Sequence, residues 1–424
     1  MPLTFDISGA GLSPDAFPPA LGQKARDAME QLCRRTCAGS DFLGWLDLPD
    51  MAKDAITVIE LAAADIRARC DVLLVIGIGG SFIGARSAIE FIKSPHYNQL
   101  TKDTPDIYFA GTNLDGDQLD DLIRLCEGRE VCVNLVSKSG TTTETAVAFR
   151  SFEKLLHDRY GGDAGAHITC TCGEGPLKAY AIEKGYRLFS VPDDAGGRFS
   201  VLSPVGLLPM AVAGIDIRRV LAGAKKAKTG YFKEDLTDPA RYAVCRHYLA
   251  GQGRPVELLA TANPQLQSFG WWFQQLFAES EGKEGRGILP VPSVYTADLH
   301  SLGQFVQQGN PILFETIVRV AAGKSGTAVA PGGDFDKLSP LTGQTLDTLN
   351  RLVMQAVAEA HMAGGVPVLA LTVPDRSEES FGALVFFFEL ACAVSSLMTG
   401  INPFDQPGVE DYKHHMKQLF AELP

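Results

Sequence analysis

Three ionisable side chains, those of Glu279, His300 and Lys413, could carry acid–base chemistry, and a fourth, that of Arg198, could stabilise negative charge, although the four are far apart along the chain. Glu279 follows the aromatic stretch Trp271–Phe277, where a predicted helix gives way to a glycine-rich loop. A carboxylate beside bulky apolar residues is partly desolvated, which would raise its pKa toward that of a useful base. On spacing alone, a surface glutamate in a loop is the simpler interpretation.

His300 and Lys413 each lie on a predicted helix. The stretch from Val294 predicts a helix that ends at Gly309, with His300 in its first turn. The positive end of the helix dipole would keep that imidazole neutral and suited to proton exchange. Lys413 lies at the border of the apolar stripe of a second predicted helix. Lysines at such borders usually extend over the core, although an inward ammonium could also act in catalysis.

Arg198 follows Gly196 and Gly197 at a crossing between two series of predicted strands. Clefts between domains commonly hold ligands. A planar guanidinium in such a cleft suits an oxyanion or an enediolate.

A glycine-rich turn, Gly77–Gly84, follows the apolar run Leu73–Ile76 and opens a predicted helix. Glycines let backbone N–H groups approach an anion, and a helix N-terminus adds partial positive charge. The dinucleotide fingerprint fails because Phe82 occupies the place of a required glycine. A tight structural turn would explain this motif in isolation.

A second loop, Ser137–Thr145, also follows a strand and opens a helix, and seven of its residues carry hydroxyl or ammonium groups. Thr141 and Glu144 have the spacing of a capping box. One hydroxyl is enough for a cap, so the surplus favours capture of an anion such as a phosphate. Gly323-Lys324-Ser325 is no Walker sequence, because Val318 stands where its first glycine should be. We expect one phosphate site, at the carboxyl ends of the first sheet.

Short β-branched runs alternate with helical stretches, which predicts parallel sheets with crossover helices. A Gly/Pro-rich crossing over 191–209 separates two series of strands. We therefore predict an α/β fold with two doubly wound parallel-sheet domains. The predicted strands are Asp71–Ile76, Asp106–Ala110, Val131–Val136, His167–Cys172 and Leu188–Val191 in the first series, and Val256–Ala260, Ile312–Thr316 and Val366–Leu371 in the second.

The predicted organisation has three parts. Residues 1–70 form a helical N-terminal segment that packs on the second domain. Residues 71–195 form the first α/β domain, with the phosphate-binding loops. Residues 196–424 form the second α/β domain, which ends in an amphipathic helix over Val409–Phe420.

The composition narrows the classes of partner. The formal net charge is −12 and no block of like charges occurs, which argues against nucleic acid. Apolar stretches such as Gly382–Leu397 look too short or too interrupted to span a bilayer, and no signal peptide is visible, so we expect a cytoplasmic protein. The nine cysteines have no zinc-binding spacing. We expect no metal.

Five phrases, in this order, resemble the glucose-6-phosphate isomerase (phosphoglucose isomerase) family, in its shorter bacterial form. The resemblance runs from about Asp71 to the C-terminal helix. The sequence departs from the family pattern at Ala278, where glycine is frequent, and at Ala195, where valine is common. The phrases are Gly77–Gly84, Ser137–Thr145, Gly196–Gly206, Glu279–Lys283 and Asn402–Glu410.

The resemblance implies a role for each matching residue. Glu279 would shuttle a proton between C1 and C2, and Arg198 would stabilise the enediolate. His300 and Lys413 would assist ring opening. The substrate and its phosphate would be bound by Gly80, Ser81, Ser137, Lys138, Ser139, Thr142, Gln275 and Gln406.

The resemblance also implies two sugar-isomerase (SIS-type) domains, no cofactor, a hexose phosphate substrate, and a homodimer whose neighbouring subunit supplies the histidine. The predicted reaction interconverts glucose 6-phosphate and fructose 6-phosphate. Two alternatives remain open: a non-catalytic sugar-phosphate sensor with SIS-type domains, and an isomerase of another hexose phosphate such as mannose 6-phosphate.

Overall fold

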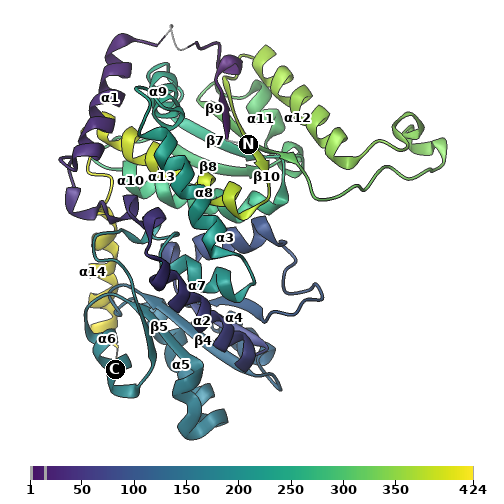
Figure 1. Ribbon diagram of the computed structural model, residues 1–424. Coiled ribbons are helices and arrows are strands. Elements are labelled where there is room, and N and C mark those ends of the chain that lie inside the picture. The colour runs from purple at the N-terminus through teal and green to yellow at the C-terminus, as the bar shows by residue number, and fades with distance from the viewer. Residues whose placement is uncertain (1–2, 14–16, 424) are drawn as a thin grey trace.

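Buried apolar strands build two separate five-stranded sheets. The computed structural model describes residues 3–13 and 17–423, with the first sheet in the lower half of Figure 1 and the second in the upper half. The predicted α/β fold with parallel sheets is confirmed.

The first sheet is parallel throughout, in the order β3-β2-β4-β5-β6. Every residue of β2, β4 and β5 is buried, as expected where helices cover both faces of a parallel sheet. Ile76 pairs with Leu135, so the loops that follow β2 and β4 leave the sheet side by side. The strands are β2 (Val72–Ile76), β3 (Asp106–Ala110), β4 (Val131–Ser137), β5 (Ile168–Cys172) and β6 (Arg187–Ser190). The helices between and beside them are α3 (Ile83–Ile92), α4 (Gly116–Leu125), α5 (Thr143–Tyr160) and α6 (Pro176–Lys184).

The second sheet has the order β1-β10-β9-β7-β8, with only β1 antiparallel among its described strands. Its strands are β1 (Thr4–Asp6), β7 (Val256–Thr261), β8 (Leu289–Val294), β9 (Leu313–Ala322) and β10 (Val368–Asp375). β8 was not predicted from the sequence. Its Pro290 and Pro292 argue against a strand in the centre of a sheet, but prolines are tolerated in an edge strand such as this one. The N-terminal segment, predicted to be helical, does contain helices but also contributes β1, which adds a strand to this sheet.

The remaining helices surround the second sheet or join the two halves. They are α1 (Pro19–Arg34), α2 (Lys53–Arg69), α7 (Pro204–Val212), α8 (Ile217–Tyr231), α9 (Asp238–Gly251), α10 (Gln267–Glu281), α11 (Gly303–Gln308), α12 (Leu346–Ala363), α13 (Glu378–Met398) and α14 (Gly408–Ala421). The N-terminal helix α2 packs against α7, and α7 also packs against α3 of the first half. The domain boundary at residue 195 therefore stays a prediction.

Helix α13 is the central helix of the larger half and packs against α1, α8, α9 and α10. By length and composition this helix could cross a membrane. The expectation that the apolar stretch Gly382–Leu397 is too short or too interrupted to span a bilayer is therefore wrong. However, 89% of its most apolar window is buried inside the protein, as in the core helix of a globular domain.

Glycines allow α8 and α13 to pack backbone against backbone. A Cβ added at Gly223 of α8 would overlap the backbone oxygen of Glu379, and one added at Gly382 of α13 would overlap that of Val220. Close-packed interiors relax only partly around added atoms. The separation of these helices is therefore fixed by the absence of two side chains.

We expect Gly223→Ala to lower the free energy of unfolding by about 1–3 kcal/mol, because the added methyl group must push α8 away from α13. Gly230→Ala, in the same helix but with open space around its Cβ position, should instead be neutral or stabilising by up to about 1 kcal/mol. Urea unfolding of both variants measures the difference. Equal effects would show that helix propensity, and not helix contact, governs position 223.

Candidate active site

The guanidinium of Arg198 is the centre of a hydrogen-bond cluster that joins three distant parts of the chain. Its side chain is buried, with the residue only 2% exposed. Nε donates to Ser280 Oγ at 2.8 Å, and Nη1 donates to Gln406 Oε1 at 2.7 Å and to Glu279 Oε2 at 3.2 Å. Nη2 donates to the backbone oxygens of Pro403 and Asp405 at 2.6 and 3.0 Å.

Burial lowers the pKa of Arg198, while the charge of Glu279 opposes that shift. An arginine has so high an intrinsic pKa that its guanidinium stays protonated here. The cluster therefore places a permanent positive charge, with its hydrogen-bond donors in fixed directions, against the carboxylate of Glu279.

Glu279 lies two residues before the end of α10 and is the partly open member of the cluster, with 33% of its side chain exposed. Gln275, one turn earlier in the same helix, donates from Nε2 to Glu279 Oε1 at 3.2 Å. Both carboxylate oxygens are thus oriented by neighbours while a face of the group remains accessible to a ligand. Such an arrangement suits a proton acceptor that must meet a substrate.

The end of α10 is held from its other side by a second buried arginine. Arg246 is fully buried and donates to Glu281 Oε1 at 2.5 Å and to Glu257 Oε2 at 2.6 Å. Burial alone would lower the pKa of Arg246, but Glu281 and Glu257 outweigh it and raise that pKa. Three consecutive residues, 279 to 281, are therefore fixed by two buried guanidinium groups.

The predicted glycine-rich loop lies against this cluster. A Cβ at Gly80 would overlap the backbone of Gly197, and a Cβ at Gly79 would come within 2.8 Å of Gln275 Nε2. Only residues without side chains permit this approach. Ser81 ends the short 3-10 turn Gly79–Ser81 at the start of α3, so the loop, the Arg198 segment and α10 meet at one place.

The hydroxyl-rich loop is folded by its own side chains. Ser137 Oγ accepts from the backbone N–H of Gly140 at 3.1 Å, and Ser139 Oγ accepts from that of Thr141 at 3.2 Å. The predicted capping box is wrong, because the N-cap of α5 is Thr142 and its side chain makes no capping bond. The N-terminal N–H groups of an 18-residue helix thus open beside several hydroxyls.

Lys138 ties this loop to the chain crossing that leads to Arg198. Its Nζ donates to the backbone oxygens of Asp193 and Ala195 at 2.8 and 3.0 Å, and it lies 5.3 Å from the ring centroid of Phe42. Desolvation lowers the pKa of Lys138, with Asp193 and Asp194 opposing. The ammonium adds positive potential behind the loop while it fixes the loop's position.

His300 is placed differently from the sequence prediction. It ends the 3-10 turn Ala297–His300, so it is not in the first turn of a helix, and it is exposed. Asp298 fixes this turn by accepting from the backbone N–H of Val294 at 2.6 Å. Among the described residues, no hydrogen bond or ion pair joins His300 to Arg198 or Glu279.

Lys413 lies on α14, whose predicted buried stripe is not buried within this chain. Tyr412, Leu419 and Phe420 are 56%, 64% and 43% exposed, and no described residue of α14 is buried. The ammonium pairs with Glu410 at 2.7 Å in the same helix. The apolar stripe that Lys413 borders is therefore open within the single chain, and a catalytic role for this lysine stays a prediction.

The structure thus unites Arg198, Glu279, Gln275 and Gln406 with the glycine-rich loop, and leaves His300 and Lys413 outside the cluster. Sequence analysis missed Ser280, which accepts from Arg198, and Trp272, whose Nε1 donates to the backbone oxygen of Arg198 at 3.1 Å. Both lie on α10 near Glu279, and the helical spacing of that segment was the available signal. Within residues 3–13 and 17–423, no group of three His, Cys, Asp or Glu side chains is arranged to hold a metal ion.

Comparisons with solved structures agree with this fold. A hypothetical protein from Thermus thermophilus superposes with a TM-score of 0.88 at 29% identity, covering 99% of this chain and 100% of its own. A glucose-6-phosphate isomerase from Chlamydia trachomatis superposes with a TM-score of 0.83 at 20% identity, covering 100% of this chain and 89% of its own.

Sequence comparisons identify the family. Glucose-6-phosphate isomerases from Bacillus cytotoxicus and Bacillus thuringiensis are each 45% identical to this chain, over 92% of its length and 88% of theirs. The family model described as phosphoglucose isomerase matches residues 63–310, which include Arg198, Glu279 and both loops. The chain belongs to the phosphoglucose isomerase family.

Proposed function

We propose that this chain interconverts glucose 6-phosphate and fructose 6-phosphate by moving a proton between C1 and C2 of the open-chain sugar. The observation that carries this proposal is the half-open carboxylate of Glu279, held by Arg198 and Gln275 beside the Gly79–Gly80 turn. Membership of the family and the 45% identity to named glucose-6-phosphate isomerases support it.

The substrate phosphate would be bound by the two loops at the carboxyl ends of β2 and β4. Hydroxyl groups of Ser137, Ser139 and Thr142 and the N-terminus of α5 would donate to its oxygens, with Lys138 supplying positive potential. Gly80 and Ser81 would border the sugar on the other side. Binding at this non-reacting group would position the reacting carbons.

Proton transfer would then be the task of Glu279, which would remove the proton from C2 and return it to C1. The resulting enediolate carries negative charge, which the guanidinium of Arg198 would balance without reorganisation, because that group is already fixed by five acceptors. Gln275 and Gln406 would hold sugar hydroxyls.

Ring opening requires protons to be exchanged at the ring oxygen and its hydroxyl, which we assign to His300 and Lys413. Since neither contacts the Glu279 cluster within the described chain, we propose a homodimer in which His300 of one subunit completes the site of the other. The open apolar face of α14 supports an association between chains. We expect this dimer to act in the cytoplasm, without a cofactor.

A coupled assay tests the reaction directly. Purified protein should form fructose 6-phosphate from glucose 6-phosphate, and its kcat/KM should exceed that for mannose 6-phosphate. Binding of glucose 6-phosphate without turnover would instead identify a sensor, and a preference for mannose 6-phosphate would identify an isomerase of another hexose phosphate.

The variant Glu279→Gln should lower kcat by about 10²- to 10⁴-fold, because it removes the general base. Its affinity for glucose 6-phosphate should change little, because the amide keeps the shape and one hydrogen-bond acceptor. Steady-state kinetics and calorimetric titration measure the two quantities. Glu284→Gln, five residues further in the exposed loop, is the matched control and should turn over normally. Near-normal kcat in Glu279→Gln would remove this residue from the mechanism.

The shared site can be tested by mixing two inactive variants. If His300 and Glu279 of one site come from different subunits, Glu279→Gln and His300→Ala chains refolded together should regain about a quarter of the wild-type activity, since half of the dimers are mixed and each has one intact site. Each variant refolded alone provides the control. No recovery on mixing, with mixed dimers demonstrated, would place both residues in the same subunit.

A further inference from the structure

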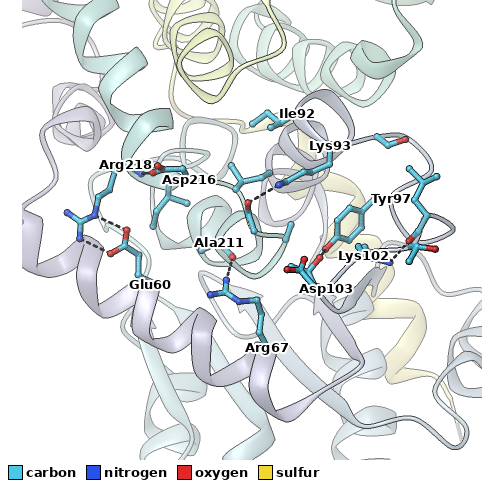
Figure 2. Close-up of a pocket in the computed structure, with 18 of the residues that line it drawn as sticks. Glu60, Arg67, Ile92, Lys93, Tyr97, Lys102, Asp103, Ala211, Asp216 and Arg218 are labelled. Atoms are coloured by element: carbon cyan, nitrogen blue, oxygen red, sulfur yellow. Dashed lines mark hydrogen bonds and ion pairs between the residues drawn. The ribbon is translucent and has the colours of Figure 1, made fainter. Parts of the chain in front are cut away.

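A large cavity lies where four helices from both halves of the molecule end or begin. Its volume is about 950 Å³. Its walls include the end of α3 at Ile92 and Lys93, the end of α7 at Ala211, and the start of α8 at Ile217. Figure 2 shows Arg67 of α2 and Lys93 reaching into it from opposite sides.

The cavity is basic although the whole chain is acidic. Five basic and three acidic residues line it, against a net charge of −12 for the chain. A local surplus of cations of this kind attracts anions despite the global field. The basic residues are Arg67, Lys93, Lys102, Arg218 and Lys324, and the acidic ones are Glu60, Asp103 and Asp216.

Two of these cations are neutralised by carboxylates. Arg218 pairs with Glu60 at 2.7 Å, as the dashed lines in Figure 2 show, and Lys102 pairs with Asp106 at 2.5 Å. Asp216 is also engaged, because its Oδ1 accepts from the backbone N–H groups at the start of α8. These groups therefore contribute little net charge to the cavity.

Within the part of the chain that the structure describes, the other three cations donate hydrogen bonds only to backbone oxygens. Arg67 Nη1 donates to Ala211 O at 2.5 Å, and Lys93 Nζ donates to Gly214 O at 2.8 Å. Lys324 Nζ donates to Ile92 O at 2.8 Å. Each keeps further N–H donors, since a guanidinium has five and an ammonium three.

Two of these cations, Lys93 and Lys324, are also close enough to affect one another. Desolvation lowers the pKa of Lys324 first, and the charges of Arg376 and Lys93 lower it further, with Glu378 and Asp375 opposing. Repulsion between like charges is relieved when an anion binds between them. The positive charges that line the cavity would therefore be stabilised by an anion bound between them.

We propose that this cavity is a second anion site, separate from the substrate loops, which binds a small phosphorylated metabolite through Arg67, Lys93 and Lys324. A phosphate monoester presents three terminal oxygens to three cationic donors, which a single carboxylate cannot do. The volume exceeds that of orthophosphate, so an organic remainder would lie along Tyr97, Leu100 and Ile217.

The position of the cavity relates it to the active site. Helix α3 begins directly after the Gly79–Ser81 turn and ends at the cavity, and α7 follows the Arg198 segment and also ends there. At 1.5 Å per residue, α3 spans about 15 Å. The second site would thus contact the far ends of two helices whose beginnings border the catalytic cluster.

Calorimetric titration with inorganic pyrophosphate, at constant ionic strength, tests the proposal. The wild-type protein should bind two pyrophosphates per chain, one at the loops and one in the cavity. Lys93→Gln with Lys324→Gln should weaken one of them by about tenfold or more, because two charge-assisted contacts are lost. Glutamine keeps N–H donors on a shorter side chain but loses the positive charge.

Two matched pairs of substitutions serve as controls. Lys154→Gln with Lys233→Gln makes the same charge change at exposed positions outside the cavity and should leave both sites intact. Lys93→Arg with Lys324→Arg keeps both positive charges and should retain the second site. If the Lys93→Gln, Lys324→Gln substitutions leave unchanged every pyrophosphate site that the wild-type protein has, whether one or two, these cations only stabilise helix ends. Because the readout is stoichiometry, it is independent of the turnover assay.

Discussion

The hydrogen bonds of the buried Arg198 guanidinium are the interactions on which the geometry of the candidate active site depends. Three segments that are far apart in sequence, the chain crossing, α10 and the stretch before α14, meet at this group, and the last two give it its acceptors. A buried charge that loses a partner is destabilising, so the segments cannot separate freely. The same guanidinium also donates to Glu279, so one group both holds the three segments together and orients the proposed base.

Topology supplies the rest of the arrangement. Parallel strands direct the loops after β2 and β4 to one edge of the sheet, and the crossing that follows β6 returns the chain to that edge. Gly80 then permits a backbone contact with Gly197 that any side chain would prevent, and Gly79 adopts a positive φ beside Gln275. Candidate site residues from both halves can therefore meet without long connections.

Sequence reasoning identified the first sheet, three strands of the second, both loops, Arg198 and Glu279, because apolar runs, glycines and helical spacing are local signals, whereas Gln275 and Gln406 came only from the family resemblance. It failed where the outcome depends on tertiary context. Pro290 and Pro292 are compatible with β8 only because that strand lies at the edge of the sheet. Strand β1 is too short to be recognised before its partner β10 is known. The periodicity around Lys413 indicates an apolar face correctly, yet it cannot tell whether that face is covered by the same chain. The position of His300 depends on a short turn that has no strong pattern.

The prolines of β8 also constrain how this protein can associate. An edge strand normally offers a row of backbone donors to any extended segment, which makes it a template for aggregation. Pro290 and Pro292 have no N–H group, so this border of the second sheet cannot form a regular ladder with a foreign strand. Assembly through continuous intermolecular sheets is thereby disfavoured at this margin, and contacts through side chains of helices are left as the available route.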